Sequence, residues 1–443
     1  MAGWTSSLSE KPRTDRPRRL SHWINAGQEK KVHSLVDKVY SKKNLALAWK
    51  AVKENRGAGG VDGVSLADFE TNLDENLRHL GKDLRTGGYK PQPLRRVYIP
   101  KTGKKDELRP LSIPSIGDRV VQQALVQRLS PIFEQDLDDG NFGYRPHRST
   151  HDALKKVWRE LMSGNEWVVD ADLKDFFGSV DHSKLMELVA RRVSDGKVLR
   201  LIERILQAPV IDKGQQKPTK QGTPQGGGAS PLLANILLTP FDKEMRARGY
   251  RLTRYADDWV ITCSSRAEAN TALETAKKIL EKLGVVLHQE KTRIVHVTMG
   301  FQFLGYTIRR GTRRLQLAEH QIKSGAKQRS LYATPHEKAR QKFKDRIRSL
   351  TRRRTPLNIA ELIRRINPVI RGWGNYFRRA KIRKLFHQLD GWIERRIWSH
   401  RFKRWRNRGW KELPTRKLCG ELGLIRLTHL IPSLERLKWA YSS

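Results

Sequence analysis

The chain contains almost no cysteine. Only Cys263 and Cys419 occur among its 443 residues, and two distant cysteines cannot build a disulfide framework or a cysteine-rich zinc site. Apolar runs of about 18 residues are also missing, which excludes a transmembrane helix or a secretory signal in the sequence as given. These absences favour a protein of the reducing cytoplasm.

Negative charge is scarce as well. Lys and Arg number 88 against 46 Asp and Glu, which gives a net charge of +42. Such an excess repels itself unless a polyanion is bound, so nucleic acid is the expected partner. A ribosomal-type or architectural binding protein would be equally basic. Charge therefore indicates the partner and leaves the activity open.

The first third of the chain predicts helices around one hairpin. Apolar residues at helical spacing predict helices over residues 32–54, 65–84 and 117–133, and an alternating pattern predicts a strand over 94–100 with a partner over 110–114. The length of the chain leaves room for two or three domains.

The middle third changes character. An apolar strand over 167–173 and an alternating stretch over 251–262 are separated by two helical segments and a glycine-rich loop, and a helix follows over 269–283. The loop ends at Ser230-Pro231, a cap residue followed by proline, which is typical of a helix start. We expect a strand-helix-strand core with a mixed sheet.

Strand signals vanish from Gln321 onward. Residues 341–410 hold 22 Lys and Arg against 4 Asp and Glu, a net charge of +18, with tryptophans interleaved. We expect a basic helical domain here. The basic, proline-rich stretch 11–19 is expected to be an arm that contacts RNA.

Three acidic residues lie in apolar surroundings. Asp172 ends the first predicted strand of the core, and Asp257 with Asp258 interrupts the second. Buried carboxylates are costly unless cations or metal ions pair with them. Salt bridges to the many basic residues are one solution, but two adjacent acids repel each other, which favours a divalent ion.

The ligand type selects the ion. Oxygen donors without nearby His or Cys are typical of Mg²⁺. Two such ions about 4 Å apart are the usual arrangement for in-line phosphoryl transfer, and a nucleic-acid partner fits that chemistry. We expect two Mg²⁺ ions, with Mn²⁺ as a substitute.

Three segments resemble, in the family's order, the sequence motifs of reverse transcriptases. They are Asp-Leu-Lys-Asp-Phe-Phe at 172–177, the glycine-rich loop and helix start at 221–235, and Tyr-Ala-Asp-Asp at 255–258. The resemblance implies an α+β right-hand polymerase with fingers, a palm with a mixed or antiparallel sheet, and a helical thumb. It implies RNA-directed DNA polymerase activity, with catalytic and metal-binding roles for Asp172, Asp257 and Asp258.

The resemblance also implies a nucleotide site. Its residues are Lys101, Arg109, Phe177, Gln225, Gly226 and Lys291. Lys101 and Arg109 would grip the triphosphate, Lys291 would lie near the phosphates, and the Phe177 ring would exclude a ribose 2′-hydroxyl. The alternatives are that Lys101 and Arg109 are solvated basic side chains and that Phe177 belongs to the core.

Two further segments resemble group II intron proteins. Residues 57–63 are similar to the N-terminal extension of group II intron and non-LTR enzymes, and residues 370–377 are similar to the thumb, or domain X, of intron maturases. The implied RNA-binding residues of this segment and its end are Arg371, Trp373, Asn375, Tyr376, Arg378 and Arg379. Arg145 belongs to the reverse transcriptase pattern, which implies a template-contact or a structural role for it. An alternative is that Trp373 and Tyr376 belong to the helix core and only the arginines touch RNA.

The resemblance sets the expected domains and partners. We expect an N-terminal extension over 1–90, fingers over 91–165, palm over 166–310 and thumb with basic helices over 320–443. Expected partners are group II intron RNA, an RNA template with a DNA primer, dNTPs and target DNA, with no membrane. The protein would act as a monomer in a bacterial, nucleoid-associated ribonucleoprotein during splicing and retrohoming.

The C-terminal third and the acids bear on the alternatives. Only Cys419 lies in the last third, without paired metal spacing, so we expect a group IIC-like protein that lacks the endonuclease domain. A non-catalytic maturase is disfavoured because the three aspartates are intact. A domesticated enzyme of defence or repair has the same motifs and stays open. An RNA-dependent RNA polymerase is disfavoured by Phe177 and the Tyr-Ala-Asp-Asp form.

Overall fold

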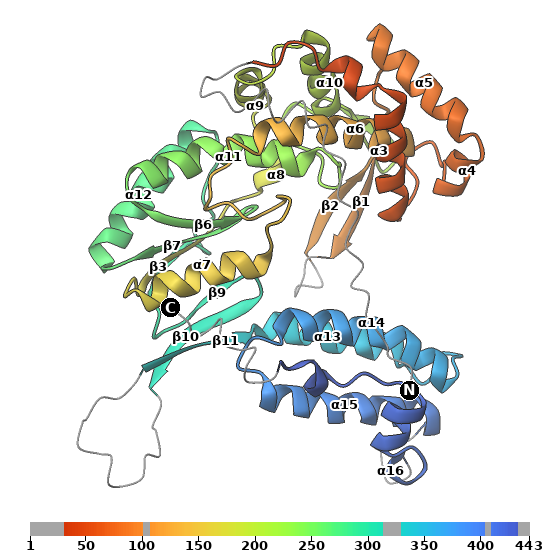
Figure 1. The fold of residues 1–443 in the computed structure, drawn as a ribbon, viewed down its shortest axis with the longest axis vertical. Coiled ribbons are helices and arrows are strands. Elements are labelled where there is room, and N and C mark those ends of the chain that lie inside the picture. The colour runs from red at the N-terminus through yellow and green to blue at the C-terminus, as the bar shows by residue number, and fades with distance from the viewer. Residues whose placement is uncertain (1–30, 101–106, 313–328, 404–408, 433–443) are drawn as a thin grey trace, which may run out of the picture. The chain divides into compact units, whose positions relative to one another are not determined.

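The computed structural model describes residues 31–100, 107–312, 329–403 and 409–432 (Figure 1). The chain forms two compact units. Unit 1 consists of Met1–Val97, Leu111–Leu137 and Phe177–Thr239, and unit 2 of Tyr98–Pro110, Asp138–Phe176 and Pro240–Ser443. Each unit therefore joins segments that are far apart in the sequence.

Unit 1 is mainly helical. Its helices are α2 (Val36–Val39), α3 (Lys42–Glu54), α4 (Leu66–Thr71), α5 (Leu73–Thr86), α6 (Ile116–Phe133), α8 (Phe176–Ser179), α9 (His182–Ala190), α10 (Gly196–Leu206) and the start of α11 (Ser230–Ala247).

Two of the predicted helices are divided. The stretch 32–54 breaks before Ser41, whose side chain accepts a hydrogen bond from the Asn44 N–H and caps α3. The stretch 65–84 breaks at Asn72 between α4 and α5. Both breaks are set by local backbone geometry, which apolar spacing alone does not reveal.

The predicted hairpin is confirmed. Strands β1 (Leu94–Pro100) and β2 (Leu108–Ile113) are neighbours in a four-stranded sheet with β4 (Val210–Asp212) and β5 (Gln215–Lys217), in the order β2-β1-β4-β5. Strands β1 and β4 run parallel.

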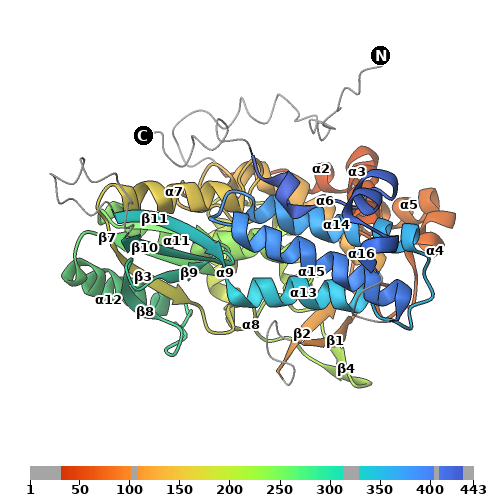
Figure 2. The same ribbon diagram turned by 90° about the horizontal axis from the view of Figure 1, so that it is seen from below.

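The predicted strands of the core form the palm sheet in unit 2. It consists of β3 (Trp167–Asp172), β6 (Arg251–Tyr255), β7 (Asp258–Cys263) and β8 (Arg293–His296), in the order β6-β7-β3-β8. All three neighbouring pairs are antiparallel, so the expected mixed pairing does not occur in this sheet. Helices α7 (Thr150–Met162) and α12 (Arg266–Lys282) lie on its opposite faces (Figures 1 and 2).

A second sheet of unit 2 corrects one prediction. Strands β9 (Phe301–Phe303), β10 (Tyr306–Thr312) and β11 (Arg329–Pro335) pair in the order β11-β10-β9. The expectation that no strand follows Gln321 is wrong, because β11 pairs with β10 along its whole length. This strand is held by its partner ladder and has little apolar alternation of its own, so the sequence pattern does not show it.

Three long helices complete unit 2. They are α13 (Glu337–Leu350), α14 (Ile359–Phe377) and α15 (Arg383–Phe402), and they lie side by side in Figure 2. Their buried residues share one apolar core with the β9–β11 sheet and with Val168 and Val260 of the palm sheet. Short turns of helix follow at α16 (Gly409–Glu412), η2 (Lys417–Glu421) and η3 (Leu427–Leu430). Among the helices of the described ranges, none is both long and apolar enough to cross a membrane.

Candidate active site

The palm sheet brings the three predicted aspartates together. In the antiparallel pairing of β3 with β7, Asp172 lies directly opposite Asp258, and residues so paired have Cα atoms about 4.5–5.5 Å apart. Asp257 precedes Asp258 in the turn that joins β6 to β7, and this turn is closed by the pair Tyr255↔Asp258. One sheet edge therefore carries all three carboxylates.

Two of these carboxylates, those of Asp257 and Asp258, have raised pKa values. Burial raises the pKa of Asp258 to about 7, and the nearby charges of Asp170, Asp257 and Asp172 add to the rise. Burial also raises the pKa of Asp257, again with a contribution from Asp172. A cation at this edge would offset both the burial and the mutual repulsion.

Carboxylate oxygens are suitable ligands for a divalent ion, but in this structure they do not surround a common position. Across the described ranges, no three His, Cys, Asp or Glu side chains are already arranged to hold a metal ion. The Lys291 Nζ instead lies 2.5 Å from the Asp172 Oδ2. Lys291 is 59% exposed, so its ammonium group has room to turn away when the carboxylate takes another cation. The structure thus places the predicted Lys291 beside the predicted Asp172.

A buried ion pair lies beneath the aspartate turn. The Arg254 side chain is 0% exposed and that of Asp242, from α11, is 1% exposed. The Arg254 guanidinium donates two hydrogen bonds to the Asp242 carboxylate and a third, of 2.9 Å, to the Ala256 carbonyl. Ala256 has a φ of +61°, an uncommon conformation for a residue with a side chain. The guanidinium therefore holds the backbone of the turn at Ala256.

A loop of unit 2 fixes the same turn from the side. A Cβ atom at Gly143 would come within 2.2 Å of the Ala256 nitrogen, so only glycine allows this approach. Arg145 is buried and donates hydrogen bonds to the carbonyls of Asp138 and Asn141, of 2.6 and 2.9 Å. These contacts give Arg145 a loop-supporting role, and its predicted RNA contact remains a prediction.

Sequence reasoning did not find the pair of Arg254 and Asp242. The two residues belong to different elements, and only folding brings them together. A signal was present, because Arg254 is a charged residue in the interior of a predicted strand, where a buried charge requires a partner.

Comparison with known proteins adds the decisive observation. Residues 99–308 match the family described as reverse transcriptase (RNA-dependent DNA polymerase), and residues 340–418 match the group II intron maturase-specific domain. Protein YkfC of Escherichia coli (strain K12) is 33% identical over 364 residues, which cover 73% of this chain and 92% of that protein.

The chain belongs to the group II intron-encoded reverse transcriptase/maturase family. The group II intron-encoded protein LtrA of Lactococcus lactis subsp. cremoris is 30% identical over 328 residues, 59% of this chain and 54% of LtrA. A putative COX1/OXI3 intron 1 protein of Saccharomyces cerevisiae is 26% identical over 340 residues, 64% of this chain and 40% of that protein. The chain thus spans about half the length of LtrA.

The family confirms several predictions. The right-hand polymerase fold, the reverse transcriptase domain and the RNA-directed DNA polymerase class are as predicted. Reverse transcriptases use divalent metal ions, and group II intron maturases bind intron RNA. The maturase-specific domain contains α14 and α15 and most of α13, which we call the maturase helices. The expected group IIC-like type stays a prediction.

The predicted nucleotide residues of this reverse transcriptase lie in both units. In unit 1, Phe177 is half-buried in α8 and its carbonyl accepts a 2.7 Å hydrogen bond from the Thr223 N–H. The Gln225 carbonyl accepts a 2.8 Å hydrogen bond from the Ser112 N–H of β2. Gly226 has a φ of +113°, and a Cβ atom there would meet the Ser112 oxygen at 2.7 Å. The glycine-rich loop therefore lies directly against β2.

The remaining two nucleotide residues belong to unit 2. Arg109 is exposed in β2. Burial raises the pKa of the Tyr144 hydroxyl and the Asp257 charge adds to the rise, whereas the Arg109 charge opposes it. The Arg109 charge thus acts on Tyr144, which lies near the turn that carries Asp257. Lys101 lies outside the described residues.

The predicted RNA-binding residues of α14 divide between two environments. Arg371 and Arg379 are exposed. Trp373 stacks on Phe343 with ring centroids 4.5 Å apart, inside the apolar core. Tyr376, Asn375 and Arg378 are half-buried. Trp373 and Tyr376 therefore face the core, which was the alternative that the sequence left open.

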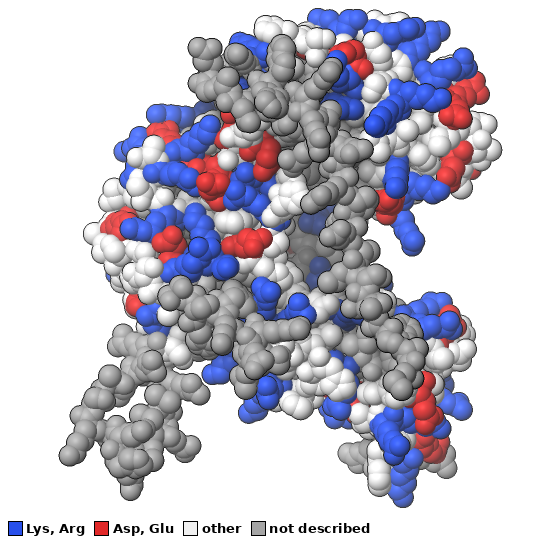
Figure 3. All heavy atoms as spheres, viewed as in Figure 1, with Lys and Arg blue, Asp and Glu red and all other residues white. Residues whose placement is uncertain are grey.

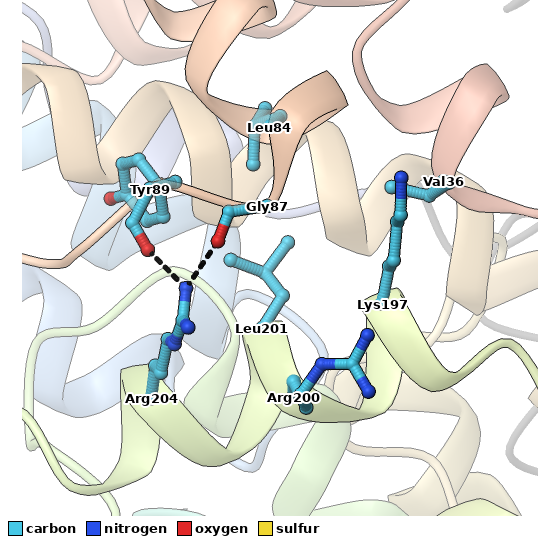
Figure 4. A pocket seen from close by; sticks show the side chains of 8 residues that line it. All are labelled: Val36, Leu84, Gly87, Tyr89, Lys197, Arg200, Leu201 and Arg204. Atoms are coloured by element: carbon cyan, nitrogen blue, oxygen red, sulfur yellow. Dashed lines mark hydrogen bonds between the residues drawn. The ribbon is translucent and has the colours of Figure 1, made fainter.

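Two other features of the molecule are its basic surface and a small cavity in unit 1. Figure 3 shows Lys and Arg side chains spread over the described parts of the visible face, with fewer acidic ones between them. A cavity of about 20 Å³ in unit 1 is lined partly by basic side chains, but Arg204 donates to the Gly87 and Tyr89 carbonyls there (Figure 4). Lys197 likewise donates to the Arg85 carbonyl. This cavity lies between α5 and α10 and is too small for a nucleotide.

Proposed function

We propose that this chain copies RNA into DNA with two Mg²⁺ ions held by Asp172, Asp257 and Asp258. The observation that carries the proposal is the register of the palm sheet, which pairs Asp172 with Asp258 beside Asp257. The raised pKa values of Asp257 and Asp258 support it, since such carboxylates are stabilised by a cation. When bound, the ions would lower the pKa of the primer 3′-hydroxyl and neutralise the leaving pyrophosphate.

The chain's own residues supply position and charge. Arg254 and Asp242 hold the backbone of the turn that carries Asp257, so that backbone needs little reorganisation. Lys291, released from Asp172, would place its ammonium group near the triphosphate of the incoming nucleotide, and Arg109 would contact the same group. These two basic residues bind and orient the substrate.

We also propose that the maturase helices bind intron RNA during splicing and retrohoming. Their surface supports this role, since the region 341–410 carries a net charge of +18 and arginines such as Arg371 and Arg379 are exposed. Exposed guanidinium groups suit phosphate contacts. The particle would be a cytoplasmic ribonucleoprotein. An intron role requires ribozyme sequence on both sides of the reading frame, and its absence there would redirect the proposal to a domesticated enzyme.

The polymerase proposal is tested with Asp257→Asn. We expect primer extension on poly(rA)/oligo(dT) with Mg²⁺ to fall about a thousandfold or more, because a metal ligand is lost. Binding of the same duplex should stay within about twofold of wild type. Asp345→Asn is the matched control, since this exposed acid lies on α13, outside the palm sheet, and pairs with Arg348 and Gln341 of its own helix. Residual extension within tenfold of wild type would refute the proposal.

The sugar-selecting role of Phe177 has its own test. Phe177→Val should improve incorporation of ribonucleotides relative to deoxyribonucleotides by about 10- to 100-fold, because a smaller side chain leaves room for the 2′-hydroxyl. Competition between rGTP and dGTP in primer extension measures this ratio. Phe402→Val, a half-buried aromatic at the end of α15, controls for general loss of an aromatic ring. An unchanged ratio removes Phe177 from the gate.

A further inference from the structure

The turn between β9 and β10 has an unusual backbone. Phe303 pairs with Tyr306, so Leu304 and Gly305 are the two central residues of the turn. Leu304 has a φ of +48° and Gly305 a φ of +77°. Two positive φ values are the geometry of a type I′ hairpin turn, which prefers Asn-Gly. A leucine in the first position costs about 1–2 kcal/mol, so this turn depends on contacts that hold it.

Tyr376 of α14 supplies those contacts. Its hydroxyl donates a 2.8 Å hydrogen bond to the Leu304 carbonyl. Its own carbonyl accepts a hydrogen bond from the Tyr306 hydroxyl and lies 2.9 Å from the His151 Nε2. Tyr376 is thus tied to the turn through both its side chain and its backbone.

The same turn reaches a catalytic carboxylate. The Leu304 N–H donates a hydrogen bond to the Asp258 Oδ2 over 3.4 Å. This distance is at the long end for an N–H···O bond, so a displacement of a few tenths of an ångström would break it. The two polar groups of Leu304 are therefore shared between Tyr376 and Asp258.

The chain of contacts joins the two family domains. Tyr376 lies in the maturase-specific domain, and Leu304 and Asp258 lie in the reverse transcriptase domain. We propose that Tyr376 is a positioning residue, which holds the β9–β10 turn so that the Leu304 N–H orients the Asp258 carboxylate. Movement of α14 then changes the catalytic centre directly. The inference rests on the proposed role of Asp258 as a metal ligand.

Tyr376→Phe tests the proposal, because it removes the hydroxyl and keeps the ring. We expect about fivefold faster amide exchange in residues 301–307, from the loss of one hydrogen bond. Mn²⁺ binding, measured by electron paramagnetic resonance, should weaken about fivefold, and kcat for primer extension should fall by a similar factor. The melting temperature and the Kd for poly(rA)/oligo(dT) should stay at wild-type values.

Two further variants separate positioning from a merely structural role. Tyr332→Phe, on β11 of the same sheet, removes another half-buried tyrosine hydroxyl and should change none of these quantities. Leu304→Asn in the Tyr376→Phe background should restore most of the lost Mn²⁺ affinity and kcat, because Asn-Gly forms the turn without help.

Other results would overturn the inference. Wild-type amide exchange and Mn²⁺ affinity in Tyr376→Phe, with or without weaker duplex binding, would make Tyr376 a simple RNA contact or packing residue. A lower melting temperature with no recovery by Leu304→Asn would make its role structural. Failure of the proposed function appears elsewhere, as primer extension that survives Asp257→Asn, and amide exchange in 301–307 still decides whether Tyr376 holds the turn.

Discussion

The palm sheet and the maturase helices use charge in opposite ways. Next to the turn between β6 and β7 of the palm sheet, charged groups are withdrawn from solvent, as in the fully buried pair of Arg254 and Asp242 and in the Asp258 carboxylate, whose pKa burial raises. On the maturase helices, aromatic and aliphatic side chains fill the inner face, whereas arginines such as Arg371 on α14 and Arg379 in the turn that follows it are exposed. Both regions lie in unit 2 and share one apolar core.

This difference predicts how each region responds to a substitution. A buried charge that loses its partner is compensated neither by an opposite charge nor by water. One substitution is therefore expected to have a large effect. An exposed cation that contacts RNA contributes one phosphate neutralisation among many, so its loss has a small and additive effect. Substitutions in the palm should therefore change stability or catalysis sharply, and those on the maturase helices should change RNA affinity gradually.

The largest effect is expected at the buried ion pair. Asp242→Leu leaves the Arg254 guanidinium buried without its carboxylate and should lower the free energy of unfolding by about 3–5 kcal/mol. Urea denaturation measures the loss. The double variant Asp242→Leu with Arg254→Met should recover most of it, because the uncompensated charge is gone, while extension stays reduced. A single variant within about 1 kcal/mol of wild type would remove the distinction between the two regions.

An intermediate effect is expected at Asp258 and depends on pH. Burial raises the pKa of Asp258 to about 7 in the folded, metal-free protein, from an ordinary aspartate value of 3.8. Between these values the folded state binds more protons than the unfolded state, so stability should fall as pH rises from about 4 to 7 and level off above. Asp258→Asn should remove about 2–4 kcal/mol of this fall.

Thermal unfolding at several pH values, in EDTA and in Mg²⁺, checks this prediction. Saturating Mg²⁺ should stabilise the wild-type protein near pH 7.5 and should stabilise Asp258→Asn less. The same pH profile in both proteins would show that Asp258 does not titrate in this range.

The smallest effect is expected on the maturase helices. Arg371→Gln should lower the log-log salt slope of RNA binding by about 0.7–0.9 for one lost phosphate contact and leave the melting temperature unchanged. Arg396→Gln is the matched comparison, since Arg396 donates to the Thr351 side chain and carbonyl. It should lower stability by about 1 kcal/mol without changing the slope.

Titration of a labelled RNA hairpin at several salt concentrations measures both variants. If Arg371→Gln changes only the salt slope and Arg396→Gln changes only the stability, exposure on these helices identifies the arginines that contact RNA. Identical behaviour of the two variants would mean that exposure on these helices does not identify RNA contacts.

The sequence indicated the three aspartates that the palm sheet brings together, because each lies in a short, local motif. It did not reveal the Arg254 pair with Asp242, because that contact joins a strand to a helix and exists only after folding. Strand β11 was missed for a related reason, since its pairing with β10 stabilises it more than its own apolar pattern does. Helical spacing placed Tyr376 on α14 but could not show that it faces the β9–β10 turn.

The most direct test is the position of bound metal in crystals grown with a primer-template, a dNTP and Mn²⁺. The anomalous difference map should show two peaks about 4 Å apart, in contact with the carboxylates of Asp172, Asp257 and Asp258. Peaks at other residues, or none at this sheet edge while nucleotide is bound, would contradict the account.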